Sequence, residues 1–172
     1  MRHNTRKWLG SLLLLVVLAA GCGAMRQSAA ERKTEGARVA TAVRQMLDGR
    51  HYTVNVDFMN PTRGAGRNVG GEGYSLTVNG DKVNSHLPYV GVSTSVPYGG
   101  GKVLTFEDDI DEYKELQAAS DRRVFVFTTD NDEDVITFEL TVFDNGQADI
   151  LVRSRNREQI SFRGELDTEA DK

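Results

Sequence analysis

The chain has 172 residues, a formal charge of −4 and one cysteine. Its acidic balance argues against nucleic acid as a partner, because neutralising phosphates requires clustered lysine and arginine. A single cysteine excludes an intramolecular disulfide.

The first 21 residues predict a secretory signal. Arg2, Arg6 and Lys7 precede an apolar run over residues 11–21, which is too short to span a membrane comfortably. Removing 21 residues leaves 151, close to the size of one domain, and the loss of three positive charges takes the formal charge from −4 to −7.

Cys22 ends this run in the sequence Leu18-Ala19-Ala20-Gly21-Cys22, which resembles the lipobox of bacterial lipoproteins. The resemblance implies cleavage before Cys22 and its acylation by fatty chains such as palmitate, although Ala19 stands where the lipobox favours leucine. Several acyl chains on one cysteine give a stable membrane anchor. The alternative is an ordinary cleaved signal that leaves Cys22 as a free thiol.

Residues 22–30 are small or polar and predict a flexible linker to a single β-rich domain over residues 31–166. Apolar residues at three- and four-residue spacing predict an amphipathic helix from about Ala30 to Leu47, and Gly49 is available for a left-handed cap. We expect the apolar stripe to pack on the core. A helix that binds a partner or a membrane surface is the alternative.

After Gly49 the apolar period changes to two, which predicts strands. One buried face comprises Tyr52, Val54, Val56 and Phe58, and Asn60-Pro61 ends this strand. A glycine-rich loop over residues 64–73 follows and is expected to be flexible. Strands near residues 74–78 and 83–87 then form a hairpin through a two-residue turn at Asn79-Gly80 or Gly80-Asp81.

Four more strands follow near the C-terminus, and two of them form a hairpin. Residues 123–128 are apolar on both faces, which predicts a strand covered on two sides. A three-residue loop, Asp144-Asn145-Gly146, sets Val142 opposite Ala148 and joins strands near residues 136–142 and 148–152. A last strand covers about residues 160–166, and residues 167–172 form a polar tail.

The predicted fold is mainly β: an N-terminal helix followed by an antiparallel sheet of about seven or eight strands. Short turns without crossover helices exclude a parallel sheet. We expect a barrel-like or strongly curved sheet, with a two-layer β-sandwich as the alternative.

Most of the mature chain resembles a known family of domains. Five short motifs in order look like the DUF4251 family of bacterial lipoproteins, a domain of unknown function: Tyr52-Thr53-Val54, Met59-Asn60-Pro61, residues 85–91, residues 143–146 and residues 156–164. The resemblance implies an exported, lipid-anchored β-rich domain. It implies no activity and supplies no functional residue.

No motif predicts a cofactor, a metal or catalysis. Residues 64–70 lack the glycine spacing of a dinucleotide loop. Asp130, Asp132 and Asp134 alternate like calcium ligands, but Val135 stands where the calcium loop needs glycine, so a solvated acidic turn is expected. A second acidic cluster over residues 107–112 indicates a wet loop. The mature chain keeps two histidines, His51 and His86, without a nucleophile motif, so we expect no enzyme.

Tyr89 and Tyr98, each directly after a proline and followed by a glycine within two residues, form the candidate binding surface. The alternative is that both tyrosines plug the mouth of the sheet. Arg153, Arg155 and Arg157 share one parity, which predicts one solvated face or an anion-binding stripe.

Two functions therefore remain. The first is a non-catalytic, lipid-anchored envelope protein that binds an envelope protein or glycan. The second is a carrier of a small apolar ligand inside the curved sheet, for which Ser85, Ala148 and Gly164 are small inward residues. Gly23 stands where enteric-type sorting places an inner-membrane aspartate, so we expect an outer-membrane address facing the periplasm.

Overall fold

The computed structural model describes residues 28–91, 104–131 and 134–168. Two compact units make up the chain, residues 1–35 and 36–172. In the described part, one helix is followed by ten strands. The elements are α2 (Ala29–Gly49), β1 (His51–Pro61), β2 (Arg67–Asn68), β3 (Ser75–Asn79), β4 (Lys82–Leu87), β5 (Leu104–Asp109), β6 (Glu112–Ala118), β7 (Arg122–Asn131), β8 (Asp134–Phe143), β9 (Gln147–Ser154) and β10 (Ile160–Leu166).

Helix α2 begins with a capping box. The Glu31 amide donates to the Ser28 hydroxyl, and the Ser28 amide donates to the Glu31 carboxylate. Near its other end, Val43 and Leu47 are buried in the core, which confirms the predicted apolar stripe. The predicted cap is wrong by one residue, because Arg50 adopts the left-handed conformation, with a φ of 52°.

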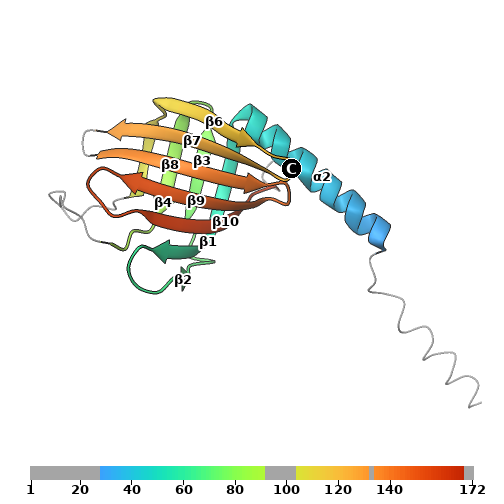
Figure 1. Ribbon diagram of the computed structural model, residues 1–172, viewed down its shortest axis with the longest axis horizontal. Coiled ribbons are helices and arrows are strands. Elements are labelled where there is room, and N and C mark those ends of the chain that lie inside the picture. The colour runs from blue at the N-terminus through green and yellow to red at the C-terminus, as the bar shows by residue number, and fades with distance from the viewer. Residues whose placement is uncertain (1–27, 92–103, 132–133, 169–172) are drawn as a thin grey trace, which may run out of the picture. The chain divides into compact units, whose positions relative to one another are not determined.

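The strands form one antiparallel sheet in the order β5-β4-β3-β1-β10-β9-β8-β7-β6, with β2 paired to β1. The sheet curls on itself, so that β6 to β10 cross in front of β3 and β4 in Figure 1. The mainly β fold with a strongly curved, barrel-like sheet is thus confirmed, and the strands outnumber the predicted seven or eight. The additional ones are β2, β5 and β6.

The chain turns the corner of this half-barrel between β5 and β6. The Ile110 amide donates to Asp81, and the Asp111 amide donates to Thr128, so the corner is bound to both sides of the sheet. The acidic residues 107–112 are therefore part of β5, the corner and β6, and the predicted wet loop is wrong. Strand pairing supplies backbone hydrogen bonds that the side-chain pattern does not reveal.

Both predicted hairpin turns are confirmed. Asn79 pairs with Lys82, which leaves Gly80-Asp81 as the turn, and Gly80 has a φ of 63°. Gly146 has a φ of 88°, and Val142 lies opposite Ala148 as the three-residue loop requires.

The core fills the inside of the curved sheet. Phe127 and Phe138 are fully buried and stack with ring centroids 5.0 Å apart, and Phe106 from β5 approaches Phe138 at 6.4 Å. The predicted two-sided burial of residues 123–128 is wrong, because Val124 and Val126 are only half-buried. Their face of β7 borders solvent, so only the inward residues of this strand join the core.

The glycine-rich loop after β1 is organised around one core residue. Val69 is fully buried, and its amide donates to the carbonyl of Asp57 at 2.8 Å. Within the same loop, β2 pairs with the end of β1, with Asn68 opposite Phe58. The sequence prediction of a plain flexible loop missed both features.

Candidate functional site

A β-bulge in β1 determines which side chains reach the outer face of the sheet. The pairing of β1 with β10 shifts register between Val56 and Phe58. A bulge inserts one extra residue and reverses the alternation beyond it. Met59 is therefore buried in the core at 2% exposure, while Phe58 is half-buried and faces outward. The prediction that Phe58 continues the buried face of Tyr52, Val54 and Val56 is wrong.

Phe58 joins a groove on the outer face of β8, β9, β10 and β1, with a volume of about 500 Å³. Its outward side chains form two rows that follow the strand register. The first row is Thr141, Asp149, Arg163 and Phe58. The second row is Glu139, Leu151, Ser161 and Asn60. Four strands at about 4.8 Å spacing make each row roughly 14 Å long.

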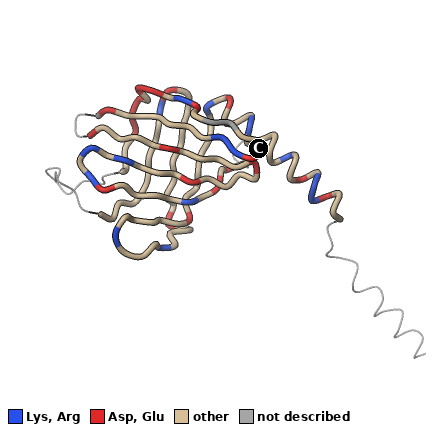
Figure 2. Tube along the Cα trace, viewed as in Figure 1, with Lys and Arg blue, Asp and Glu red and all other residues tan. Residues whose placement is uncertain are grey.

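The carboxylates of the groove are paired with arginines on neighbouring strands. Arg153 donates to Glu139 at 2.9 Å, and the Nε atom of Arg163 lies 3.7 Å from Asp149. The Asp149 side chain remains 57% exposed, so its oxygens are accessible from the groove. Figure 2 shows both charge signs interspersed along β8, β9 and β10. The groove thus offers charged, amide and hydroxyl groups beside one aromatic ring.

The loop between β1 and β2 fixes the position of the Phe58 ring. A Cβ atom on Gly66 would lie 2.6 Å from Cε1 of Phe58 and 3.2 Å from Oδ1 of Asn60. Only glycine permits this approach without displacing the ring. The guanidinium carbon of Arg163 lies 5.9 Å from the centroid of the same ring. The Phe58 ring therefore contacts the loop and also lies near a side chain from β10.

The candidate residue Tyr89 lies elsewhere, after the end of β4. Its hydroxyl donates to the backbone carbonyl of Glu158 at 3.2 Å, and burial raises the pKa of this tyrosine. The Glu158 carboxylate accepts from Arg63 at 2.8 Å. Tyr89 thus helps to fasten the loop between β9 and β10, and its role as a binding surface stays a prediction. Tyr98 lies outside the described residues.

The same loop contains a buried ion pair. Arg157 pairs with Asp134 at the start of β8, and their side chains are 4% and 1% exposed. The Ser154 hydroxyl also donates to the Asp134 carboxylate. The predicted arginine stripe is wrong, because β9 ends at Ser154 and Arg157 turns inward, whereas Arg153 stays on the surface. Burying a charged side chain costs free energy, and a close counter-ion offsets that cost. The two side chains are therefore stable inside the protein only as a pair.

The predicted solvated turn of Asp130, Asp132 and Asp134 is wrong for Asp134, which is buried. Asp130 is exposed at the end of β7, and Asp132 lies outside the described residues. In residues 28–91, 104–131 and 134–168, the structure shows no cluster of three or more histidine, cysteine or carboxylate side chains that would hold a metal ion.

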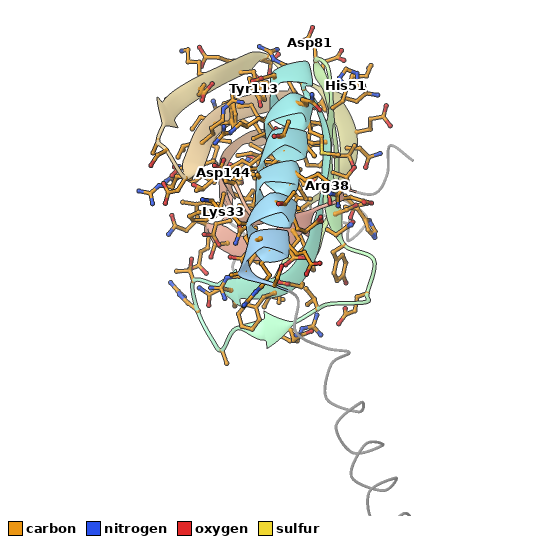
Figure 3. All side chains as sticks on the ribbon, turned by 90° about the vertical axis from the view of Figure 1, so that its right-hand side faces the viewer. Lys33, Arg38, His51, Asp81, Tyr113 and Asp144 are labelled. Carbon is orange, nitrogen blue, oxygen red and sulfur yellow. The ribbon has the colours of Figure 1, made fainter. Side chains whose placement is uncertain are left out.

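A third polar cluster closes the C-terminal end of α2. The guanidinium carbon of Arg50 lies 4.3 Å from the centroid of the Tyr113 ring, and its guanidinium pairs with Asp81; Tyr113 and Asp81 are labelled in Figure 3. The Tyr113 and Tyr52 hydroxyls are 3.1 Å apart. Burial raises the pKa of Tyr113, and it raises the pKa of Tyr52 well above the usual value. These contacts join α2, β1 and β6, so we assign them a structural role.

Two further ion pairs hold the helix to the sheet. Arg44 donates to Asp144 in the β8–β9 turn at 2.6 Å, beside the helix in Figure 3. Arg123 donates to both Asp48 and Glu115, and its hydrogen bonds to the Glu115 carboxylate hold the pKa of that carboxyl below its usual range.

His51 and His86 have separate surroundings. His51 contacts the carbonyl of Gly49, while His86 lies against the Tyr74 ring, at 5.5 Å between centroids, and near the Thr105 hydroxyl. Cys22, the predicted lipidation site, lies outside the described residues. Within the described part of the chain, no helix is both long and apolar enough to cross a membrane.

Comparisons with known proteins identify the kind of domain. The family model described as "Domain of unknown function (DUF4251)" matches residues 34–166. A similar solved structure is the crystal structure of a DUF4251 family protein from Bacteroides eggerthii DSM 20697 at 1.95 Å resolution. It is 13% identical, has a TM-score of 0.57, and the match covers 75% of this chain and 87% of that one. This likeness shows the fold alone. No curated protein matches the chain.

Proposed function

This chain belongs to the DUF4251 family of domains of unknown function, and from that premise we propose that it is a non-catalytic, lipid-anchored cell-envelope protein that binds a glycan. The observation that carries the proposal is the bulge in β1, which turns Phe58 out of the core and onto a polar groove. Bulges occur next to functional sites, where they redirect a side chain.

The chemistry of the groove favours a glycan over a protein partner. Sugars present hydroxyl groups around a ring whose carbon-bound hydrogens pack well on an aromatic face. The groove supplies the aromatic ring of Phe58 and hydrogen-bonding groups from Asn60, Thr141, Asp149 and Ser161. Protein interfaces instead centre on a larger apolar patch, whereas Leu151 and Phe58, both half-buried, are the two large apolar side chains of these rows.

The filled interior gives the ligand-carrier alternative less support. Phe127 and Phe138 occupy the inside of the sheet and are fully buried, and Phe125 beside them is 2% exposed. A close backbone contact also explains why position 164 is a glycine, since a Cβ atom there would lie 2.1 Å from the carbonyl oxygen of Asn55. Its small size therefore does not indicate an internal cavity.

Lipid anchoring rests on the lipobox-like sequence that ends in Cys22. The intact mass of the native protein should show loss of residues 1–21 and added acyl chains on Cys22. A Cys22→Ser variant should lose its membrane attachment. After fractionation, we expect the wild-type protein in the outer membrane, protected from external protease. An unmodified Cys22 would overturn the anchor.

Glycan binding is tested on the mature chain, residues 22–172, carrying Cys22→Ser for solubility. Calorimetry should detect binding to at least one polysaccharide among dextran, laminarin and polygalacturonate, and Phe58→Ala should weaken it about tenfold, a loss of about 1.4 kcal/mol. Phe143→Ala removes another half-buried aromatic ring outside the groove and should leave binding unchanged.

Two outcomes contradict this function. Release of new reducing ends from a bound polysaccharide would show catalysis. Absence of binding to all three polysaccharides would contradict the proposal that the groove binds a glycan. If the protein then captured an envelope protein, and this capture depended on Phe58, the groove would be assigned to a protein partner.

A further inference from the structure

We infer that the groove selects uncharged glycans over acidic ones through Asp149, and that Gly66 positions the aromatic ring on which the sugar stacks; the inference rests on the proposed glycan-binding function. It concerns the charge of the ligand and the position of the aromatic ring. Both follow from contacts within β1, β8, β9 and β10.

The charge of the groove disfavours an acidic ligand. Asp149 and Glu139 occupy neighbouring strands in adjacent rows, so an anion in the groove meets two carboxylates. The one arginine of the two rows, Arg163, is next to Asp149, and Arg153 at the rim is bound to Glu139. The lining of the groove thus holds two carboxylates and one guanidinium, a formal charge of −1, and that guanidinium is already next to a carboxylate.

The same carboxylates suit neutral hydroxyl groups. An ionised carboxylate accepts hydrogen bonds through two oxygens, and bonds to a charged acceptor are stronger than those between neutral groups. Asp149 lies near the middle of the first row, two strands away from Phe58. When one sugar of a glycan stacks on the Phe58 ring, the hydroxyl groups of its neighbouring sugar therefore reach Asp149.

Gly66 acts as a positioning residue for the ring and for Asn60. Its φ is not in the left-handed region, so alanine is compatible with the backbone. The added Cβ atom would nevertheless lie 2.6 Å from the Phe58 ring and would force it to move. Gly66→Ala should thus disturb the groove through side chains and leave the fold intact.

A tryptophan reporter tests the position of the ring. The only tryptophan, Trp8, lies in the predicted leader, so Phe58→Trp introduces the single tryptophan of the mature chain. Titration with dextran or laminarin should shift its emission, and adding Gly66→Ala should lower the apparent affinity about tenfold. A merely structural role for Gly66 would change the unfolding midpoint and leave the affinity alone.

Ligand charge is tested with the same mature chain. Dextran or laminarin should bind at least tenfold more tightly than polygalacturonate at matched salt. The Asp149→Asn variant should bind the neutral polysaccharide more weakly than the wild-type protein does, and polygalacturonate more tightly. Glu165→Gln is the matched control, because it removes the same charge from an exposed position of β10 outside the groove, and it should change neither.

The outcomes separate the two claims. Binding of polygalacturonate as tight as that of the neutral polysaccharides, or an unchanged preference in Asp149→Asn, overturns the inference and leaves glycan binding in place. Failure of all three polysaccharides to bind overturns the inference together with the proposed function.

Discussion

Asp134 and Arg157 form an ion pair inside the protein, although one begins β8 and the other lies in the loop before β10. Removing one partner leaves a buried charge without its counter-ion, which costs about 3–5 kcal/mol. Arg157→Met should therefore lower the free energy of unfolding by about that amount, measured by urea denaturation. The double variant Asp134→Leu, Arg157→Met should recover most of the loss.

A surface pair provides the control. Arg153 and Glu139 are 48% and 34% exposed, and such pairs contribute only about 0–1 kcal/mol. Arg153→Met should change the urea midpoint little. Equal losses in the two single variants would contradict the distinction between the buried and the exposed pair.

The bulge in β1 predicts opposite consequences for two adjacent residues. Met59→Ala creates a cavity in the core and should cost about 2–5 kcal/mol of unfolding free energy. Phe58→Ala should cost distinctly less, because that ring is half-exposed. Denaturant midpoints of the two variants measure the difference, and a larger loss in Phe58→Ala would mean that the bulge is misplaced.

Gly164 is required by a close approach of two strands. A Cβ atom there would lie 2.1 Å from the Asn55 carbonyl oxygen and 3.0 Å from the Val56 Cα atom, which is backbone that cannot move aside cheaply. Gly164→Ala should destabilise the domain by at least about 1–3 kcal/mol, measured by thermal unfolding. Gly36→Ala, where a Cβ atom meets nothing within 4 Å, should cause no loss.

Buried tyrosines predict a loss of stability in alkali. Burial raises the pKa of Tyr52 well above 10.0 in the folded protein. Its contribution is thus fully present below pH 10.0 and is lost as the pH rises above that value, because the unfolded state releases the proton first. Urea midpoints from pH 7 to pH 11 should fall less steeply in Tyr52→Phe and least in Tyr52→Phe, Tyr113→Phe. Identical slopes in all three proteins would contradict this.

Local sequence patterns predicted those secondary-structure elements well that depend on interactions between residues close together in the sequence. Gly146 accepts a positive φ, and the three-residue turn that it completes sets the register of the β8–β9 hairpin without any tertiary contact. The three-and-four spacing of Val43 and Leu47 likewise predicted the buried stripe of α2. Strands β5 and β6 were not predicted. Their inward residues, Leu104 and Phe106 in β5 and Tyr113 in β6, are few and stand among acidic residues, so no clear apolar alternation is visible in the sequence.

The candidate groove could not be predicted in the same way. Unbroken alternation assigned Phe58 to the core, and one inserted residue reversed that assignment. The sequence offers a weak signal, since Phe58 and Met59 are adjacent apolar residues where a regular strand would have one.

By itself, the sequence determined a helix and a succession of antiparallel hairpins, because turns and apolar periods are properties of adjacent residues, and it predicts a leader that is removed before Cys22. Only the tertiary structure decided that β1 pairs with β10, that Arg157 turns inward to Asp134, and that Phe58 lies beside Arg163. Those contacts join residues far apart along the chain, and their positions depend on how the whole sheet curls and on where a single bulge shifts its register.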